Sequence, residues 1–241
     1  MAKRIEFDAP GGTDVLVYRD FTPADPAPGE VQVENKAIGV NYIDTYFRSG
    51  LYPAPVSPSG VGSEAAGVVV KTGANVKHIK VGDRVVYGQS PLGAYSEIHN
   101  VPEEKLAILP DGISFETAAA CFMKGLTAFY LLRKTYEVKA GEVFLFHAAA
   151  GGVGQIACQW AKALGAKMIG TVGSDEKAQK AKAAAPGKPS TTIKKTLLSG
   201  CWHSLTVKKS VWCMGLCRQR HLAAVTGLPE APRPDGQLRQ R

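Results

Sequence analysis

The sequence lacks several features that would assign it to whole classes of protein. It has no apolar run long enough to span a bilayer, and its first residues, MAKRIEF, lead directly into a strand and not into a signal peptide. Its five cysteines are an odd number and form no run of four closely spaced ligands, so neither a disulfide framework nor a structural zinc site is expected. We therefore expect a cytoplasmic protein without membrane segments. Its 241 residues, 45% of them hydrophobic, are enough for two modest domains.

Acidic residues, tyrosine and phenylalanine become scarce after residue 184. Residues 185–241 contain ten of the 29 lysines and arginines, two of the 21 acids, and none of the eight tyrosines or eight phenylalanines. The formal charge of +8 therefore resides in this segment, and residues 1–184 are neutral overall. Because the body of the chain carries no net positive charge, we do not expect it to bind nucleic acid.

A strand, a glycine-rich turn and a helix follow one another in residues 141–162, GEVFLFHAAAGGVGQIACQWAK. Residues 142–147 are typical of a buried parallel strand, and residues 153–164 have apolar residues at helical spacing. The glycines between them allow a tight turn and the close approach of a pyrophosphate, which the helix N-terminus would attract. We predict a dinucleotide site here. Its candidate residues are Ala150, Gly151, Gly152, Val153 and Gly154.

The following strand, residues 166–172, indicates which dinucleotide binds. An NAD site usually has an acid at the end of this strand to bind the ribose hydroxyls. Here the strand ends in Gly173 and Ser174, the acids come one or two residues later in a first helical turn, and Lys177 follows. A hydroxyl, free N–H groups and a cation suit a 2′-phosphate, so we predict NADPH as cofactor. The alternative is that Lys177 is one more solvated lysine of the KAQKAK run.

Four earlier segments, considered together with this glycine-rich turn, form a recognisable set of motifs. They are residues 39–44 (GVNYID), 62–69 (GSEAAGVV), 81–85 (VGDRV) and 124–128 (KGLTA). Together with residues 141–162 they resemble the zinc-free quinone oxidoreductase and zeta-crystallin family of the medium-chain dehydrogenase/reductase superfamily, over about residues 3–184. The resemblance implies an α/β protein. A GroES-like, mainly antiparallel β catalytic domain would occupy residues 1–120, and the first part of a Rossmann, parallel-sheet NADP-binding domain would occupy residues 121–184.

The N-terminal half favours antiparallel strands independently of this resemblance. Residues 31–37 alternate apolar with polar side chains, the period of a half-buried strand. Residues 66–70, 84–87 and 94–98 are short β-rich runs bounded by glycine or proline. From Ser114, a plausible N-cap, the pattern becomes helical and continues through residues 126–134.

The residues around the expected reaction centre indicate chemistry without a metal. Zinc-dependent members of the superfamily bind their catalytic metal with a cysteine, a histidine and an acid, but Asn41 stands at the cysteine position and Ser63 at the histidine position. A quinone needs no Lewis acid, because its carbonyls are already electrophilic. The resemblance implies that Asn41, Tyr46 and Tyr52 lie near the nicotinamide and the substrate, and that Tyr130 joins the cofactor site. Alternatively, Tyr46 and Tyr52 only pack a short helix and the loop after it.

From these features we expect an NADPH-dependent quinone oxidoreductase that transfers a hydride or electrons from NADPH to a small-molecule quinone, impaired by the loss of its C-terminal half. The alternatives are a catalytically inert nucleotide-binding remnant and another enone or alkenal reductase of the same superfamily. The family is homodimeric, and the loss of the edge that it uses would make dimerisation of this chain doubtful.

Residues 185–241 do not continue the Rossmann pattern. We expect an irregular basic tail with a short helix near residues 211–225, and a sheet in which the strand at 142–147 or at 167–172 keeps an unpaired edge. A shifted reading frame explains the change in composition. Back-translation of residues 185–192 in that frame permits TWQAINY, and the codons around residues 212–215 permit VYGSV, both similar to the family's next segments.

Two alternatives for this tail remain. Cys213, Cys217 and His221 recur every four residues and would line one face of a helix, with Cys201 and His203 upstream, so zinc binding is one alternative. A basic nucleic-acid-binding arm is the other alternative. Neither explains why the Rossmann pattern ends where the composition changes.

Overall fold

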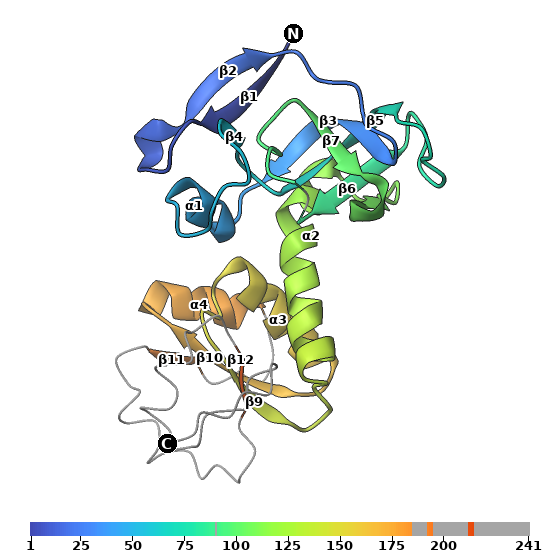
Figure 1. The fold of residues 1–241 in the computed structure, drawn as a ribbon. Helices are drawn as coiled ribbons and strands as arrows, with labels where there is room; N and C mark the ends of the chain where they lie inside the picture. Colours follow the sequence, from blue (N-terminus) through green and yellow to red (C-terminus); the bar gives the residue numbers. More distant parts are fainter. Residues whose placement is uncertain (90, 185–191, 195–211, 215–241) are drawn as a thin grey trace, which may run out of the picture. The chain divides into compact units, whose positions relative to one another are not determined.

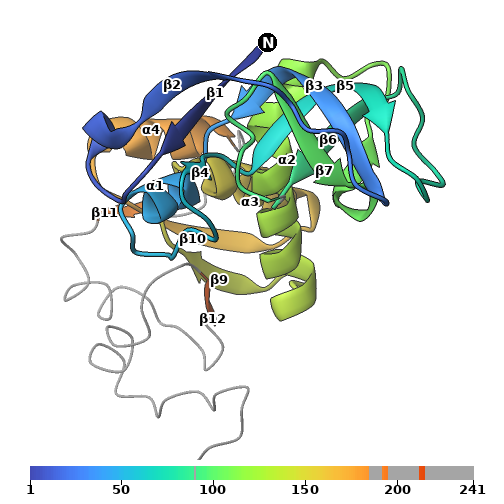
Figure 2. The same cartoon turned by 45° about the horizontal axis from the view of Figure 1, so that its top comes forward.

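The computed structural model describes residues 1–89, 91–184, 192–194 and 212–214. The chain divides into two compact units, Met1–Thr127 and Ala128–Arg241, and the boundary lies inside helix α2, Phe115–Phe129. Figure 1 labels the elements of both units, and Figure 2 shows them from a second direction. In the part of the chain that the structure describes, no helix is long and apolar enough to cross a membrane.

The first unit contains two antiparallel sheets (Figure 1). The smaller sheet has the order β2-β1-β4, with β1 at Ala2–Phe7, β2 at Val17–Phe21 and β4 at Ser59–Gly60. The larger sheet has the order β7-β3-β5-β6-β8. Its strands are β3 (Glu30–Gly39), β5 (Glu64–Thr72), β6 (Arg84–Gly88), β7 (Ile98–Pro102) and β8 (Leu106–Ile108). The expected antiparallel, GroES-like architecture is confirmed.

Strand β3 shows why the alternating sequence forms this sheet. Val31 and Val33 are fully buried and pack in one core cluster with residues of the neighbouring strands, such as Val69 and Tyr87. The intervening side chains are partly exposed, as a period of two residues requires. The pairing of β3 with β5 has two register shifts, and beside one of them Gly67 lies so close to the Glu34 backbone that a Cβ atom there would overlap it.

One predicted strand is misplaced. Residues 94–98 were expected to form a strand, but the strand of this region is β7, which begins at Ile98. The preceding residues bond to several different segments: Tyr95 O accepts from Ile5 N, Tyr95 N donates to Val61 O, and the Asn35 side chain donates to the Ala94 and Ser96 carbonyls. These tertiary hydrogen bonds replace the ladder that the β-rich composition predicted.

The helices of the first unit begin at side chains suited to capping. Helix α1 (Tyr42–Arg48) follows Asn41, and α2 follows Ser114, whose Oγ accepts the backbone N–H of Thr117 at 3.2 Å. The predicted Ser114 cap is thus present. The unit also has two short 3-10 turns, Thr13–Val15 and Glu103–Lys105.

The second unit contains a parallel sheet of order β11-β10-β9-β12. Its strands are β9 (Val143–Phe146), β10 (Lys167–Val172), β11 (Thr192–Lys194) and β12 (Trp212–Met214). The order places β9 between β10, which follows it in the chain, and β12, which comes much later. This reversal of strand order at β9 is the arrangement of a doubly wound sheet, so the expected Rossmann-type parallel sheet is confirmed.

Two helices pack beside one another against this sheet (Figure 1). Helix α3, Gly152–Ala163, connects β9 to β10, and α4, Asp175–Ala184, follows β10. Buried residues from these elements, including Phe144, Cys158 and Met168, form one hydrophobic cluster. A π-helix, Tyr130–Thr135, extends α2, and the Phe129 ring stacks on Trp160 of α3 with centroids 6.0 Å apart.

The structure departs from two expectations for the tail. The second edges of β9 and β10 are not left unpaired, because Trp212–Met214 pairs with Phe144–Phe146 of β9 and Thr192–Lys194 pairs with Gly170–Val172 of β10. Trp212–Met214 is also extended and not part of a helix at residues 211–225; the rest of that predicted helix, like the proposed zinc ligands Cys201, His203, Cys217 and His221, lies outside the described residues. The physical reason is that backbone pairing along a parallel strand requires only a short extended segment, which the side-chain pattern did not reveal.

Candidate functional site

The glycine-rich turn of the second unit leaves β9 and enters α3 through one residue of left-handed conformation. That residue is Ala148, with φ +55°, whereas Gly151 has φ −75°. The sequence analysis attributed the tight turn to the glycines, and the structure corrects this assignment. A non-glycine residue at positive φ is uncommon and marks a backbone that its surroundings hold in place.

Thr171 on β10 provides these surroundings. Its carbonyl accepts the Ala149 N–H at 3.1 Å, and its Oγ1 lies 3.1 Å from His147 Nδ1 and 3.4 Å from the Ala148 nitrogen. The turn closes with a bond from Gly151 N to the Ala148 carbonyl at 2.8 Å. The neighbouring strand therefore fixes the path of the turn before the helix begins.

Gly154 is required for the approach of α3 to this turn. A Cβ atom at Gly154 would lie 2.5 Å from the Ala148 carbonyl oxygen and 2.6 Å from the Ala149 Cα, both backbone atoms that cannot move independently. A Cβ at Gly151 would meet only the Ala148 oxygen, at 3.1 Å. Gly154, the third glycine of the motif, thus allows α3 to pack closely on the end of the preceding strand. Gly151 is exposed, and the space beside it is open.

The N-terminus of α3 fits a phosphate group. Gly151 is the N-cap, and no side chain caps the helix there. The Gln155 side chain donates to the Ala150 carbonyl at 3.1 Å, so it holds the turn and not the helix N–H groups. Unshielded first-turn N–H groups and the positive end of the helix dipole attract a phosphate, and the proposed residues Ala150 to Gly154 surround this point.

The end of β10 carries the second part of the predicted cofactor site. The strand ends at Val172, Gly173 follows with nothing within 4 Å of a Cβ placed on it, and α4 begins at Asp175. Ser174 Oγ accepts the backbone N–H of Lys177 at 3.3 Å and so acts as the N-cap of α4. Asp175 and Glu176 occupy the first helical turn, as expected, and not the strand end.

Tyr130 lies apart from these segments in the chain, in the π-helix after α2. Its side chain is 57% exposed. It remains a proposed contact of the cofactor.

The first unit carries the other predicted site residues, beginning with Asn41. As N-cap of α1, Asn41 forms a reciprocal capping box with Asp44, in which the Asn41 backbone N–H donates to Asp44 Oδ2 at 2.9 Å. The Tyr95 hydroxyl donates to the same Asp44 oxygen at 2.9 Å. Burial raises the pKa of Asp44, although both hydrogen bonds oppose the shift, and burial beside Asp44 raises the pKa of Tyr95.

The Asn41 side chain leads to two residues that the sequence analysis missed. Its Nδ2 donates to Glu64 Oε2 at 2.6 Å, and the Lys124 ammonium contacts the same oxygen at 3.1 Å. Glu64 is fully buried, and its Oε1 accepts the Met123 N–H at 2.6 Å. Glu64 lies in GSEAAGVV and Lys124 in KGLTA, two of the segments that resemble the family. The signal that could have identified Glu64 is a carboxylate among small and apolar residues that are expected to be buried.

Tyr46 and Tyr52 lie side by side. Their ring centroids are 5.3 Å apart, and the Tyr52 N–H donates to the Tyr46 carbonyl at 3.0 Å. Tyr42, one turn before Tyr46 on α1, extends the row with centroids 5.4 Å apart, and its side chain is 77% exposed. Tyr42 and Tyr52 are exposed and Tyr46 is half-buried. These contacts agree with packing of α1 against the following loop, and the role of Tyr46 and Tyr52 in binding remains a proposal.

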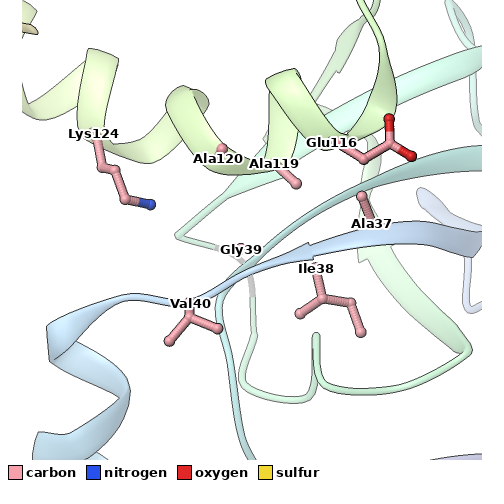
Figure 3. Close-up of a pocket in the computed structure, with 8 residues that line it drawn as sticks. All are labelled: Ala37, Ile38, Gly39, Val40, Glu116, Ala119, Ala120 and Lys124. Atoms are coloured by element: carbon pink, nitrogen blue, oxygen red, sulfur yellow. The ribbon is translucent and has the colours of Figure 1, made fainter. Parts of the chain in front are cut away.

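A shallow pocket of about 340 Å³ lies between the end of β3 and α2 (Figure 3). Lys124 and Glu116 extend from α2, and Ile38 and Val40 come from the β3 side. The wall is otherwise formed by small residues: Ala37, Gly39, Ala119 and Ala120. Lys124 thus connects this pocket to the buried Glu64 and, through it, to Asn41.

Ser63, the residue at the position of a histidine ligand in zinc-dependent relatives, is buried. Within the described ranges, no group of three or more histidine, cysteine, aspartate or glutamate side chains is arranged to hold a metal ion. The polar groups around Asn41 are instead hydrogen-bonded to one another.

Comparisons with known proteins agree with both units. The profile of the Alcohol dehydrogenase GroES-like domain matches residues 27–111. The chain is 72% identical over 181 residues to the Quinone oxidoreductase of Salmonella typhimurium, an alignment that covers 75% of this chain and 55% of the relative. It is 71% identical over 181 residues to Quinone oxidoreductase 1 of Escherichia coli, with the same coverage. The chain therefore spans little more than half the length of these relatives.

A solved structure shows the same likeness in three dimensions. The crystal structure of Escherichia coli quinone oxidoreductase complexed with NADPH superposes with a TM-score of 0.77 and 59% identity, covering 94% of this chain and 63% of that one. Both the antiparallel unit and the parallel unit have their counterparts in such enzymes. Over the aligned three quarters of its length, the chain is therefore similar to quinone oxidoreductases, and its first unit matches the Alcohol dehydrogenase GroES-like domain.

Proposed function

We propose that this chain binds NADPH and uses it to reduce a quinone. The observation that carries the proposal is the N-terminus of α3, which no side chain caps and which packs closely on the preceding turn at Gly154. After β10, Ser174 caps α4 and Lys177 follows, and the strand itself does not end in an acid. High identity to quinone oxidoreductases, one of them solved with NADPH, supports the choice of cofactor and substrate.

The residues of the second unit would hold the nucleotide. Backbone N–H groups at Gly152 to Gly154 suit the pyrophosphate, and the Ser174 hydroxyl with the exposed Lys177 ammonium suits the 2′-phosphate. Ser174 accepts one N–H bond as a helix cap, and its hydroxyl proton can still donate to a phosphate oxygen. Ala150, Val153, Gly173 and Tyr130 complete the proposed cofactor contacts.

NADPH, when bound, supplies the hydride, and the protein has to position the two reactants and keep water out. We assign Asn41 to the nicotinamide ribose or amide, and Tyr46 and Tyr52 to the quinone oxygens, which their phenols can bind as hydrogen-bond donors. A quinone carbonyl accepts a hydride without a metal, so the hydrogen-bonded Asn41 and the buried Ser63 at the ligand positions of zinc enzymes are compatible with this reaction.

Cofactor preference tests the nucleotide part. If Ser174 and Lys177 hold the 2′-phosphate, NADPH should bind more tightly than NADH, and Lys177→Glu should remove roughly 10- to 100-fold of the NADPH affinity, the scale of a charged hydrogen bond. Fluorescence titration with both nucleotides measures this. Lys180→Glu is a matched control on the same helix, because Lys180 pairs with Glu176 and is not assigned to the cofactor. Equal affinity of the unmutated protein for NADPH and NADH would contradict the assignment.

Turnover tests the reaction. NADPH oxidation in the presence of 1,4-benzoquinone should exceed that with an enone or an alkenal. A higher rate with the enone would favour the related reductase function. Tight NADPH binding without oxidation by any acceptor would identify an inert nucleotide-binding protein.

A further inference from the structure

A fully buried carboxylate lies beneath the proposed reaction centre of the first unit. Glu64, the first residue of β5, has none of its surface exposed, yet no part of the proposed reaction uses it directly. Its Oε1 accepts one N–H, from Met123, and its Oε2 accepts from Asn41 and Lys124. A buried carboxylate is costly unless such partners compensate it, so its position here requires an explanation.

The bond from Asn41 to this carboxylate determines how the amide is oriented. An asparagine amide can turn over, exchanging its nitrogen and oxygen, with almost no change in shape. An ionised carboxylate only accepts, so the 2.6 Å contact with Glu64 Oε2 specifies that the nitrogen of Asn41 faces Glu64. The capping box with Asp44 holds the backbone of the same residue at the start of α1.

The surrounding chain is built to keep the carboxylate in place. The Lys124 ammonium, 21% exposed, neutralises the charge at 3.1 Å from the side of α2. Gly39 provides the space, because a Cβ there would overlap Glu64 Oε2 and the Ala119 carbonyl. Residues of three elements, β3, β5 and α2, therefore meet at Glu64 Oε2, the oxygen that accepts the hydrogen bond from Asn41.

We propose that Glu64, supported by Lys124, is a positioning residue that fixes the orientation of the Asn41 amide for contact with bound nucleotide. This inference rests on the proposed function only for the identity of the ligand. Glu64→Gln keeps the size of the side chain but replaces one acceptor oxygen by an NH2 group. With this group in the place of Oε2, Asn41 and Lys124 both lose their acceptor, and the Asn41 amide loses its fixed orientation; with it in the place of Oε1, only the Met123 N–H loses its acceptor.

A double-mutant cycle on the full chain tests the connection. Glu64→Gln and Asn41→Ala should each lower kcat/KM for NADPH and 1,4-benzoquinone by about 10-fold or more, on the scale of a misplaced contact group. The double variant should be no slower than Asn41→Ala alone, because Glu64 acts through Asn41. Multiplied effects, or full activity of folded Glu64→Gln, would overturn the proposal. If Glu64→Gln does not fold, Glu64→Asp takes its place in the cycle. The aspartate keeps the negative charge, and its carboxylate lies one methylene further from Asn41.

Glu6→Gln is the matched control for nonspecific damage. Glu6 is another buried carboxylate of the same unit, bound to Arg4 and Arg19 and not in contact with Asn41. This control should lower the Tm and keep kcat/KM. An equal loss of kcat/KM in Glu6→Gln would show that the effect of Glu64 is general destabilisation and would overturn the proposal.

Side-chain NMR separates this inference from the proposed function. The Nδ2 signal of Asn41, identified by its absence in Asn41→Ala, should exchange slowly with water and should exchange at least about 10-fold faster in Glu64→Gln, because its acceptor is lost. An unchanged exchange rate would refute positioning by Glu64, whatever the activity. An inactive unmutated protein whose Asn41 exchange responds to Glu64→Gln would refute the quinone reductase function and uphold the positioning.

Discussion

At the scale of single residues, the glycines of the nucleotide turn have different tasks. Gly154 allows α3 to approach the Ala148–Ala149 backbone, whereas Gly151 borders open space and Ala148 itself makes the left-handed turn. A motif read from sequence treats the glycines as equivalent. The structure shows that a side chain is sterically intolerable at only one of these two glycines.

Gly154→Ala should therefore destabilise the second unit. Its Cβ would lie 2.5 Å from the Ala148 carbonyl oxygen, and we expect a loss of roughly 1–3 kcal/mol, typical of overpacking. Gly125→Ala is the control, because Gly125 is interior to α2 with nothing within 4 Å of its Cβ; it should be neutral or stabilise by up to about 1 kcal/mol. Urea unfolding measures both. A Gly154→Ala protein as stable as Gly125→Ala would contradict the close packing.

Cys121 and Cys158 should differ in reactivity. Burial raises the pKa of Cys158 to about 11 and leaves its side chain 2% exposed, whereas Cys121 is exposed on α2. Since the thiolate is the reactive form, Cys121 should react readily with a disulfide reagent at about pH 8 and Cys158 should not until the protein unfolds.

Kinetics of thiol titration check this. Cys121→Ser should lose one fast-reacting thiol, and Cys158→Ser should keep the fast phase unchanged. A fast phase that disappears in Cys158→Ser would show that α3 opens readily.

At the scale of elements, the parallel sheet depends on segments beyond α4. The two central strands, β9 and β10, are each covered by one short strand from the chain after residue 184. An uncovered strand edge offers unpaired N–H and C=O groups for aggregation, so these short strands protect the two central strands of the parallel sheet.

Removal of residues 185–241 should therefore destabilise the protein. The irregular tail expected from the sequence would instead leave the Tm nearly unchanged on removal, because such a tail would have no role in the sheet. We expect the chain cut after Ala184 to lose more than about 4 °C in Tm, the scale of roughly 1 kcal/mol in a small domain, and to aggregate more. A chain cut after Gly200, which keeps β11 and lacks β12, should be intermediate. Equal Tm values for the full chain and the cut after Ala184 would show that the two strands add no stability.

At the scale of the whole molecule, composition changes after residue 184, where the chain becomes basic and poor in acids. The curated relatives align over 181 residues, three quarters of the chain. The shifted-frame hypothesis explains both facts, and the stretch that would encode VYGSV begins at β12. In the alternative frame, the strand that pairs with β9 would therefore have a sequence similar to that of the family.

The hypothesis predicts the behaviour of a chain translated in the alternative frame after residue 184. That chain should have a higher Tm, greater solubility and a higher kcat with NADPH and quinone than the present one, because the parallel sheet would gain apolar strands suited to its edges. Thermal unfolding and turnover measured side by side provide the test. A lower Tm and a lower kcat for the alternative chain would show that the present tail is the functional one.

Much of the fold and of the cofactor site was determined by local sequence. The alternation of Val31 and Val33 with polar residues predicts a half-buried strand. The apolar run before Gly151 predicts a strand that leads into a helix N-terminus. The end of β10 just before Gly173 and Ser174 was likewise predicted from the local sequence. These features depend on neighbours a few residues apart, whose periodicity and turn chemistry are written in order along the chain.

Only the tertiary structure decided which distant groups meet. Glu64 and Lys124 are 60 residues apart, and their convergence on Asn41 follows from the packing of β5, α1 and α2. The bonds that replace a strand before Ile98, and the pairing of Thr192–Lys194 and Trp212–Met214 with the central strands, likewise join segments far apart in sequence. Backbone pairing and buried charge compensation depend on positions in space, and no local pattern of side chains records them.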